Sequence, residues 1–327
     1  MSLQIGIIGS GSIAKQHLAG LAKMDNVKVA TFCDVIEERA KEMASEHGAK
    51  SYTDPATMFS ENKLDAVWIC LPPFAHGEAE RQALAHKIPF FVEKPVGLDR
   101  TLSRELAAEV QRTGLLTSVG YMNRFRASIQ RGRELLRNDP PILAYGAWIG
   151  KAPSRPGHWW TQKDKSGGQL VEQTTHTVDL ARYLLGDAEE VFAFATQGFN
   201  PRPEGYSIDD ASTVAVKFKN GAIANLMSAC ACGIGGGVFL NVHASKTCLR
   251  YTGWEHSVTI EQAGQDPEKI AGEPDIFALE DAQFLKAVST GDRSLIRCDY
   301  PDGLKTAELA LAANESMATG KAVKLSG

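Results

Sequence analysis

The chain has 327 residues, a length that suggests two domains, and its 43% hydrophobic and 23% charged residues are typical of a folded globular protein. It carries 35 basic and 39 acidic residues, for a formal net charge of −4, and has no block of Lys and Arg, which argues against nucleic-acid binding. No apolar run approaches the ~20 residues that cross a bilayer, and the N-terminus lacks the pattern of an export signal. We therefore expect a cytoplasmic protein without a membrane partner.

The first third of the sequence alternates short apolar runs with segments of helical spacing. The apolar runs are residues 3–8, 27–32, 66–71, 89–92 and 116–119. The helical segments are residues 13–24, 37–47, 76–86 and 101–112. This alternation predicts βαβ units around a doubly wound parallel sheet, a Rossmann-type α/β domain over residues 1–120.

A glycine-rich turn joins the first predicted strand to the first predicted helix. It has the pattern G-x-G-x-x-A, from Gly9 through Gly11 to Ala14. The glycines allow a tight turn and a close approach of the backbone to a pyrophosphate, and the N–H groups at the helix start can bind its charge. Although the motif alone is weak, it predicts that Gly9, Gly11, Ser12 and Ile13 contact a dinucleotide.

Asp34 closes the second predicted strand, 20 residues after Ala14, where a carboxylate can accept hydrogen bonds from the adenosine ribose. The alternative is that Asp34 merely caps a helix that starts at Val35 or Ile36. A carboxylate at this place repels a 2′-phosphate, and no Arg or Lys follows within four residues. We therefore predict NAD as the cofactor, with NADP less favoured.

The pattern changes after Tyr121. Residues 123–137 are predicted to form a helix, and longer alternating segments follow at residues 142–149, 191–196, 211–218 and 222–231. Asn220-Gly221, between the last two segments, predicts a tight hairpin with both turn residues at positive φ. The pattern predicts an α+β domain with a large, mostly antiparallel open sheet over residues 121–327, a substrate-binding and oligomerisation domain.

In places this second sheet has alternating apolar residues on both faces, and Phe192 and Phe194 are among its apolar residues. One helical layer can cover only one face, and the other would expose more apolar surface than monomers usually tolerate. We therefore expect a homodimer or homotetramer formed through the C-terminal sheet.

A stretch in the second domain carries paired acidic and imidazole groups. If residues 169–185 form one helix, then Glu172, His176 and Asp179 share a face, and a carboxylate one turn away can orient the imidazole. The alternatives are a surface Glu–His pair, a buried histidine satisfied by Thr or backbone, and a zinc pair. The zinc pair lacks an obvious third ligand, so no metal is predicted.

Further motifs make a family recognisable. Glu93-Lys94-Pro95 ends one strand of the first domain, and Leu71-Pro72-Pro73-Phe74-Ala75-His76 follows another. With the glycine turn and the later Gly-Gly…Glu-x-x-x-His-x-x-Asp stretch, the sequence resembles the Gfo/Idh/MocA oxidoreductases from about residue 3 to about residue 325. The resemblance implies a nucleotide-binding domain, an open-sheet domain, an active site in the cleft between them and chemistry on sugars or cyclitols. Relatives commonly carry Asp in place of Glu172 and Gly in place of Thr174, so the geometry at Glu172 departs from the pattern.

Lys94 lies at the carboxyl end of a parallel strand, where open α/β sheets bind their ligands. Pro95 favours an extended Lys94, whose ammonium can stabilise a developing alkoxide. The alternative is a solvated lysine paired with Glu93. We predict that His176 accepts the hydroxyl proton, that Lys94 polarises the same oxygen and that Glu172 orients the ring.

Other residues complete the two predicted sites. Those expected to contact the cofactor, besides the glycine turn and Asp34, are Leu71, Pro72, Pro73, His76, Glu93, Lys94 and Met122. Those expected to contact substrate are Lys94, Asn123, Arg124, Trp159, Trp160, Glu172 and His176. His76 could equally be a surface residue, Arg124 could start a solvated helix, and the two tryptophans could be core.

These features predict an NAD(P)-dependent dehydrogenase that acts on a secondary alcohol of a sugar, cyclitol or related polyol. One alternative is a non-catalytic dinucleotide-binding sensor, which would need neither Lys94 nor His176. Another is an enzyme of the same fold that modifies glycosides and recycles its NAD.

Overall fold

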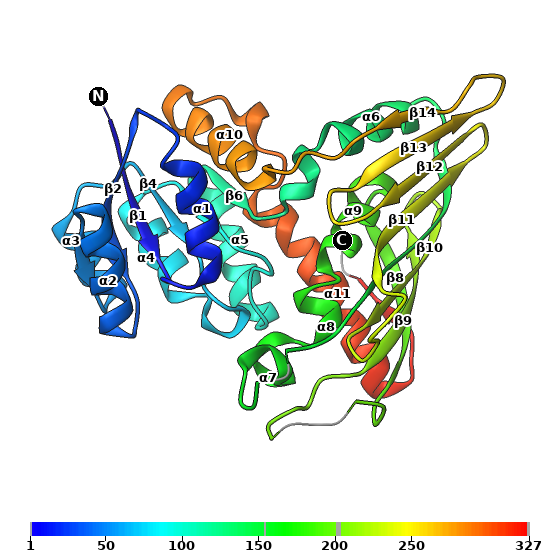
Figure 1. The fold of residues 1–327 in the computed structure, drawn as a ribbon, viewed down its shortest axis with the longest axis horizontal. Helices are drawn as coiled ribbons and strands as arrows, with labels where there is room; N and C mark the ends of the chain where they lie inside the picture. Colours follow the sequence, from blue (N-terminus) through cyan, green and yellow to red (C-terminus); the bar gives the residue numbers. More distant parts are fainter. Residues whose placement is uncertain (1, 154, 201–203, 326–327) are drawn as a thin grey trace. The chain divides into compact units, whose positions relative to one another are not determined.

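The computed structural model describes residues 2–153, 155–200 and 204–325, and the chain divides into two compact units (Figure 1). Unit 1 contains the residues up to Met122 together with Asp275–Leu304, and unit 2 contains Asn123–Pro274 and the residues from Lys305 on. The predicted boundary, with all of residues 121–327 in the second domain, differs from this division. The reason is that helix α10 (Ile276–Thr290) packs on α1 (Ser12–Leu21) and buries Phe284 and Leu285 in the core of unit 1.

Unit 1 is built on a six-stranded parallel sheet of order β3-β2-β1-β4-β5-β6. Its strands are β1 (Leu3–Ile8), β2 (Val27–Cys33), β3 (Lys50–Tyr52), β4 (Ala66–Ile69), β5 (Phe90–Val92) and β6 (Thr117–Val119). Its other helices are α2 (Glu37–His47), α3 (Pro55–Glu61), α4 (Glu78–His86) and α5 (Arg100–Thr113). Ile5, Ile7, Val67 and Trp68 are fully buried because helices cover both faces of the sheet. The Rossmann-type prediction is confirmed.

Unit 2 is built on a nine-stranded sheet of order β14-β13-β12-β11-β7-β10-β9-β8-β15. Its strands are β7 (Pro141–Ile149), β8 (Ala188–Thr196), β9 (Ala211–Phe218), β10 (Ile223–Ala229), β11 (Gly237–Ala244), β12 (Thr247–Thr252), β13 (Ser257–Gln262), β14 (Glu268–Ile270) and β15 (Val323–Lys324). Its helices are α6 (Ala127–Leu136), α7 (Lys163–Ser166), α8 (Gln169–Glu172), α9 (Thr175–Leu185) and the part of α11 (Tyr300–Thr319) that begins at Lys305. The pair β10–β7 is parallel and the other described strand pairs are antiparallel, so the predicted open sheet is confirmed.

The hairpin between β9 and β10 differs from its prediction. Gly221 has φ 89°, whereas Asn220 does not adopt a positive φ. The Gly221 N–H donates to the Phe218 carbonyl, and the Phe218 N–H donates to the Ala222 carbonyl. The connection is therefore a three-residue loop, a turn followed by one left-handed glycine, rather than a two-residue turn with two left-handed residues.

The sheet of unit 2 has one covered and one exposed face. Helices α6 and α9 pack against one side, where Leu226 and Leu240 are fully buried (Figure 1). Leu143 and Ile223 are register partners on the opposite side, and Phe194 lies on that side through its pairing with Thr213. These three side chains are 37–63% exposed.

Among the described residues, none of the helices has both the length and the apolar character that a membrane crossing requires.

Candidate active site and cofactor site

The glycine turn has the shape that a pyrophosphate needs. Gly9 has φ 91°, and a Cβ there would lie 2.4 Å from the Cys70 carbonyl oxygen, so only glycine fits. Gly11 is the N-cap of α1 and supplies no side-chain cap, and a Cβ added to it would meet nothing within 4 Å. Ala14 is fully buried, which lets α1 approach the sheet. The helix start thus offers uncapped N–H groups beside open space, and this arrangement fits a dinucleotide phosphate.

Asp34 follows β2 and is tied to the glycine turn. Its Oδ2 accepts the Ser10 N–H at 2.8 Å, and its Oδ1 accepts the Ile36 N–H at 2.9 Å. Helix α2 begins only at Glu37, with Ile36 as its N-cap. Asp34 therefore does not cap a helix that starts at Val35 or Ile36, and it lies next to the turn that the cofactor phosphates require.

The segment after β4 contains Leu71 and Pro72, followed by a short 3₁₀ helix, Pro73–Ala75. His76 precedes α4, and its Nδ1 lies 2.6 Å from Glu80 Oε1. The His76 side chain is 1% exposed, so it is not a surface residue, and its Nε2 has no hydrogen-bond partner among the described residues. A buried, unpartnered ring nitrogen in this position can bind a polar ligand atom.

Glu93 and Lys94 follow β5, and the Lys94–Pro95 peptide bond is cis. The Glu93 carboxylate is 4% exposed; its Oε1 lies 2.9 Å from His17 Nε2, and its Oε2 accepts the Lys94 backbone N–H at 3.1 Å. Gly120 makes room for it, because a Cβ there would lie 2.9 Å from Glu93 Oε1. Glu93 is therefore a buried anchor for the Lys94 backbone.

The stretch that carries Glu172 and His176 is broken into two helices. Helix α8 ends at Glu172 and α9 begins at Thr175, so the prediction of one continuous helix is wrong. The break is stabilised by a tertiary contact, since the Thr174 hydroxyl donates to Ser228 Oγ on β10 at 2.9 Å. Glu172 and His176 are both buried, and the orientation of the imidazole by Glu172 stays a prediction.

Asp179 lies three residues after His176 in the same helix, α9, and its carboxylate is bound to other residues. Arg124 donates to both of its carboxylate oxygens, at 2.6 and 2.8 Å, and the Thr306 hydroxyl donates to Oδ1 at 2.8 Å. The Arg124 guanidinium also lies 4.7 Å from the centre of the Tyr183 ring. Arg124 is 1% exposed, so it does not start a solvated helix; it joins elements of unit 2.

Asn123 lies in the short 3₁₀ helix Met122–Phe125 and is 2% exposed. Its Oδ1 accepts the Arg126 Nε–H at 2.7 Å, while its Nδ2 has no partner among the described residues. This buried amide donor can bind a substrate hydroxyl. Met122 is equally buried, at 2% exposure, and ends unit 1.

The predicted aromatic residues and one that sequence reasoning missed lie in unit 2. Trp159 and Trp160 form a short 3₁₀ helix with Thr161 and are half-buried. Trp254 lies in the turn between β12 and β13, and its ring is perpendicular to the His176 ring at 5.7 Å. Trp254 is 38% exposed, which is high for an indole, so it presents an apolar surface beside His176. A single tryptophan in a turn gave no signal that could have identified it.

Among the described residues, no group of three or more His, Cys, Asp and Glu side chains could hold a metal ion.

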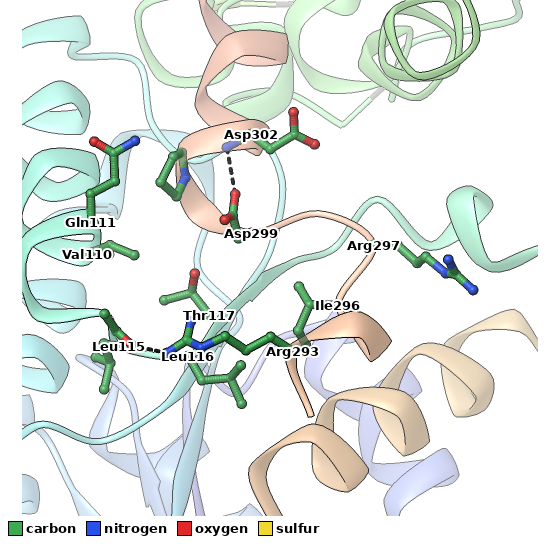
Figure 2. Close-up of a pocket in the computed structure, with 12 residues that line it drawn as sticks. Val110, Gln111, Leu115, Leu116, Thr117, Arg293, Ile296, Arg297, Asp299 and Asp302 are labelled. Carbon is green, nitrogen blue, oxygen red and sulfur yellow. Dashed lines mark hydrogen bonds between the residues drawn. The ribbon is translucent and has the colours of Figure 1, made fainter. Parts of the chain in front are cut away.

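Unit 1 also has a cavity of about 380 Å³ at the end of α5 (Figure 2). Arg293 reaches across it to the Gly114 carbonyl, and Asp299 accepts the Asp302 N–H at 2.9 Å (Figure 2). None of the predicted site residues lines this cavity, so it is not part of the candidate site.

Comparisons with known proteins agree with this geometry. The scyllo-inositol 2-dehydrogenase (NAD(+)) of Bacillus subtilis is 25% identical over 99% of this chain and 96% of its own length. The inositol 2-dehydrogenase of Rhizobium meliloti is 27% identical over 99% of this chain and 100% of its own. A structure of levoglucosan dehydrogenase in complex with NADH and levoglucosan has a TM-score of 0.88 at 19% identity and covers 99% of each chain, which shows the same fold.

Family assignments cover most of the sequence. Residues 3–121 match the oxidoreductase family with an NAD-binding Rossmann fold, and residues 141–250 match the GFO/IDH/MocA C-terminal domain. The uncapped glycine turn and the two sheets fit both matches. The chain belongs to the Gfo/Idh/MocA family of NAD-binding oxidoreductases.

Proposed function

We propose that this chain is a dehydrogenase that transfers a hydride between NAD and a secondary alcohol of a sugar, cyclitol or related polyol. The observation that carries the proposal is the order of the parallel sheet. The glycine turn, Leu71 and Lys94 follow β1, β4 and β5, which are neighbours in the sheet. The carboxyl ends of parallel strands meet at one edge, where such sheets bind ligands. The names of the inositol dehydrogenases among its relatives support the substrate class.

NAD is proposed over NADP because of Asp34. Its carboxylate lies beside the glycine turn, where it would accept hydrogen bonds from the ribose hydroxyls of a bound dinucleotide. The next two residues, Val35 and Ile36, are exposed and apolar and offer no cation to a 2′-phosphate.

Residues of this chain would carry out the transfer of the substrate hydroxyl proton. When bound, the nicotinamide ring supplies the hydride acceptor. His176 takes the hydroxyl proton, because a histidine with an ordinary pKa of about 6.5 is suited to that task near neutral pH. Lys94 donates from its ammonium group to the same oxygen as negative charge develops there. Glu172 orients the imidazole, and Asn123, whose buried amide donor has no partner among the described residues, binds a neighbouring hydroxyl.

The test is NADH formation from NAD with a panel of cyclitols, sugars and anhydrosugars, each repeated with NADP. The proposal expects turnover of at least one polyol with NAD. Binding of NAD without turnover of any polyol would favour the sensor. Conversion of a glycoside without net NADH would favour the NAD-recycling enzyme.

We also propose that unit 2 pairs with a second copy of the chain through the exposed face of its sheet. Leu143, Phe194 and Ile223 are exposed on that face, and an apolar patch of this kind marks an interface. Sedimentation at micromolar concentration should give a dimer or tetramer, and Phe194→Glu should lower the assembly constant. A monomeric wild type would contradict the pairing.

A further inference from the structure

A buried chain of charged groups links helix α10 to the backbone of Lys94. His17, on α1, is completely buried between Glu93 and Asp281. Its Nε2 lies 2.9 Å from Glu93 Oε1, and its Nδ1 lies 2.8 Å from Asp281 Oδ1. The second Glu93 oxygen accepts the Lys94 N–H at 3.1 Å. The chain therefore runs Asp281, His17, Glu93, Lys94 and lies entirely within unit 1.

With both neighbouring carboxylates ionised, the geometry requires a protonated ring. A neutral imidazole has one N–H donor and one lone pair, so one of its nitrogens would face a carboxylate oxygen without a proton between them. The protonated ring donates from both nitrogens and offsets part of the charge of the two carboxylates. Phe91 and Phe277 pack against it in T-shaped arrangements, with ring centres 4.9 and 5.6 Å away, and His17 is fully shielded from water.

Other groups around the imidazole are arranged to keep Asp281 and Glu93 in place. Trp68 Nε1 donates to Asp281 Oδ1 at 2.8 Å. Gly120 lies against the Glu93 carboxylate, where a side chain would not fit. Cys70, after β4, is a further titratable group beside these carboxylates, and its pKa is raised well above 9.0 by burial and by Glu93 and Asp281. The thiol is therefore neutral and does not compete for the His17 proton.

We propose that His17 is a positioning residue for the reaction: it holds the Glu93 carboxylate in the one orientation in which that carboxylate fixes the Lys94 backbone and so aims the Lys94 ammonium. This inference rests on the proposed function for the role of Lys94, and on distances in unit 1 for the link itself. Neither ring nitrogen of His17 is available to substrate or cofactor, because both are bound to carboxylates.

Two amide variants separate the two ends of the link. In His17→Gln the side-chain amide reaches the position of Nε2 and can still donate to Glu93. In His17→Asn the shorter amide lies near the position of Nδ1 and can donate only to Asp281. A displacement of about 1 Å at a reacting group can cost ~10²-fold in rate. We expect kcat to fall about 10- to 100-fold in His17→Asn and only a few-fold in His17→Gln, with similar NADH affinity in both.

A second readout needs neither substrate nor cofactor. The Lys94 amide donates to Glu93 Oε2, so its hydrogen exchange in the free protein reports on the link directly. Exchange at Lys94 should be faster in His17→Asn than in wild type and near the wild-type rate in His17→Gln. Lys23→Ala is the matched control, because it removes an exposed ion pair with Asp275 beside the same two helices and leaves the link intact.

If His17→Asn does not fold, Asp281→Asn replaces it, because an amide oxygen at that position still accepts the His17 Nδ1–H. Deprotonation of His17 should make kcat decline at alkaline pH, and loss of the Asp281 charge should move this decline to lower pH. Unchanged exchange at Lys94 in His17→Asn, or an unmoved pH profile in Asp281→Asn, would overturn the inference. A wild type that oxidises no polyol would instead overturn the proposed function, and the exchange experiment would still test the link.

Discussion

The two candidate catalytic side chains are held by different interactions. Lys94 follows β5 and comes directly after Glu93. Glu93 belongs to a buried network of charges that reaches Asp281. His176 lies in the first turn of α9, after a helix break, with the ring of Trp254 at its edge. The comparison teaches that the geometry at Lys94 depends on ionisation of residues distant in sequence. The geometry at His176 depends on the helix break, on packing against Trp254 and, in the proposed function, on the Glu172 carboxylate close by in the sequence.

The largest expected effect in unit 1 comes from the lysine itself. Lys94→Ala should lower kcat by about 10²–10⁴-fold, because it removes the donor to the developing alkoxide. The affinity for NADH, measured by fluorescence titration, should change little, because the glycine turn and Asp34 stay intact. Near-normal turnover in Lys94→Ala would mean that the charged network of unit 1 supports the fold and not the reaction.

His17→Ala should cost about 3–5 kcal/mol in the free energy of unfolding, since it leaves two buried carboxylates without their cation. The matched exposed pair gives the scale for comparison: Lys23→Ala should cost below about 1 kcal/mol, because the Lys23 and Asp275 side chains are 64% and 57% exposed. Chemical denaturation of both variants measures the difference. Equal losses would show that the buried network contributes no more than a surface ion pair.

Cofactor choice should respond to the residues after β2. Asp34→Ser combined with Val35→Arg should move the ratio of kcat/KM for NAD over NADP by about tenfold or more towards NADP, equivalent to at least ~1.4 kcal/mol. The change removes the repelling carboxylate and adds a cation for a 2′-phosphate. The control is Val35→Ala, which keeps Asp34. An unchanged ratio in the double variant would place Asp34 away from the ribose.

The network should also make stability depend on alkaline pH. Burial lowers the pKa of His17, but the adjacent Asp281 and Glu93 carboxylates outweigh burial and hold it well above 6.5. This stabilisation is fully present below the unfolded pKa of about 6.5 and is lost as pH rises through the higher folded pKa. The Tm difference between wild type and His17→Gln should therefore shrink as the pH is raised into the alkaline range. A constant difference would mean that His17 does not titrate there.

The elements that sequence predicts well are those set by local pattern. Strands such as β1 and β4 are continuous apolar runs because both faces are buried, so βαβ units were recognisable. Strand β3 is not recognisable from the sequence, because Lys50 and Ser51 are exposed and lack an apolar pattern. The break before α9 could not be predicted either, because it depends on the bond from Thr174 to Ser228, on a strand far along the chain.

The candidate site shows the same difference between features set by local sequence pattern and features set by long-range contacts. Lys94 and His176 were identified because they belong to recognisable motifs. His17 was not identified, because a lone histidine in a helix carries no local signal and its partner Asp281 is 264 residues away. The placement of α10 in unit 1 depends on this same long-range contact and on apolar packing against α1, which no local spacing reveals.

The most direct test of the account is the turnover of His176→Ala with a polyol that the wild type oxidises. Removal of the proton acceptor should lower kcat by about 10²–10⁴-fold and leave NADH affinity within a few-fold of wild type. His176→Ala with near-normal turnover would contradict the account and would make Lys94 the better candidate for the base.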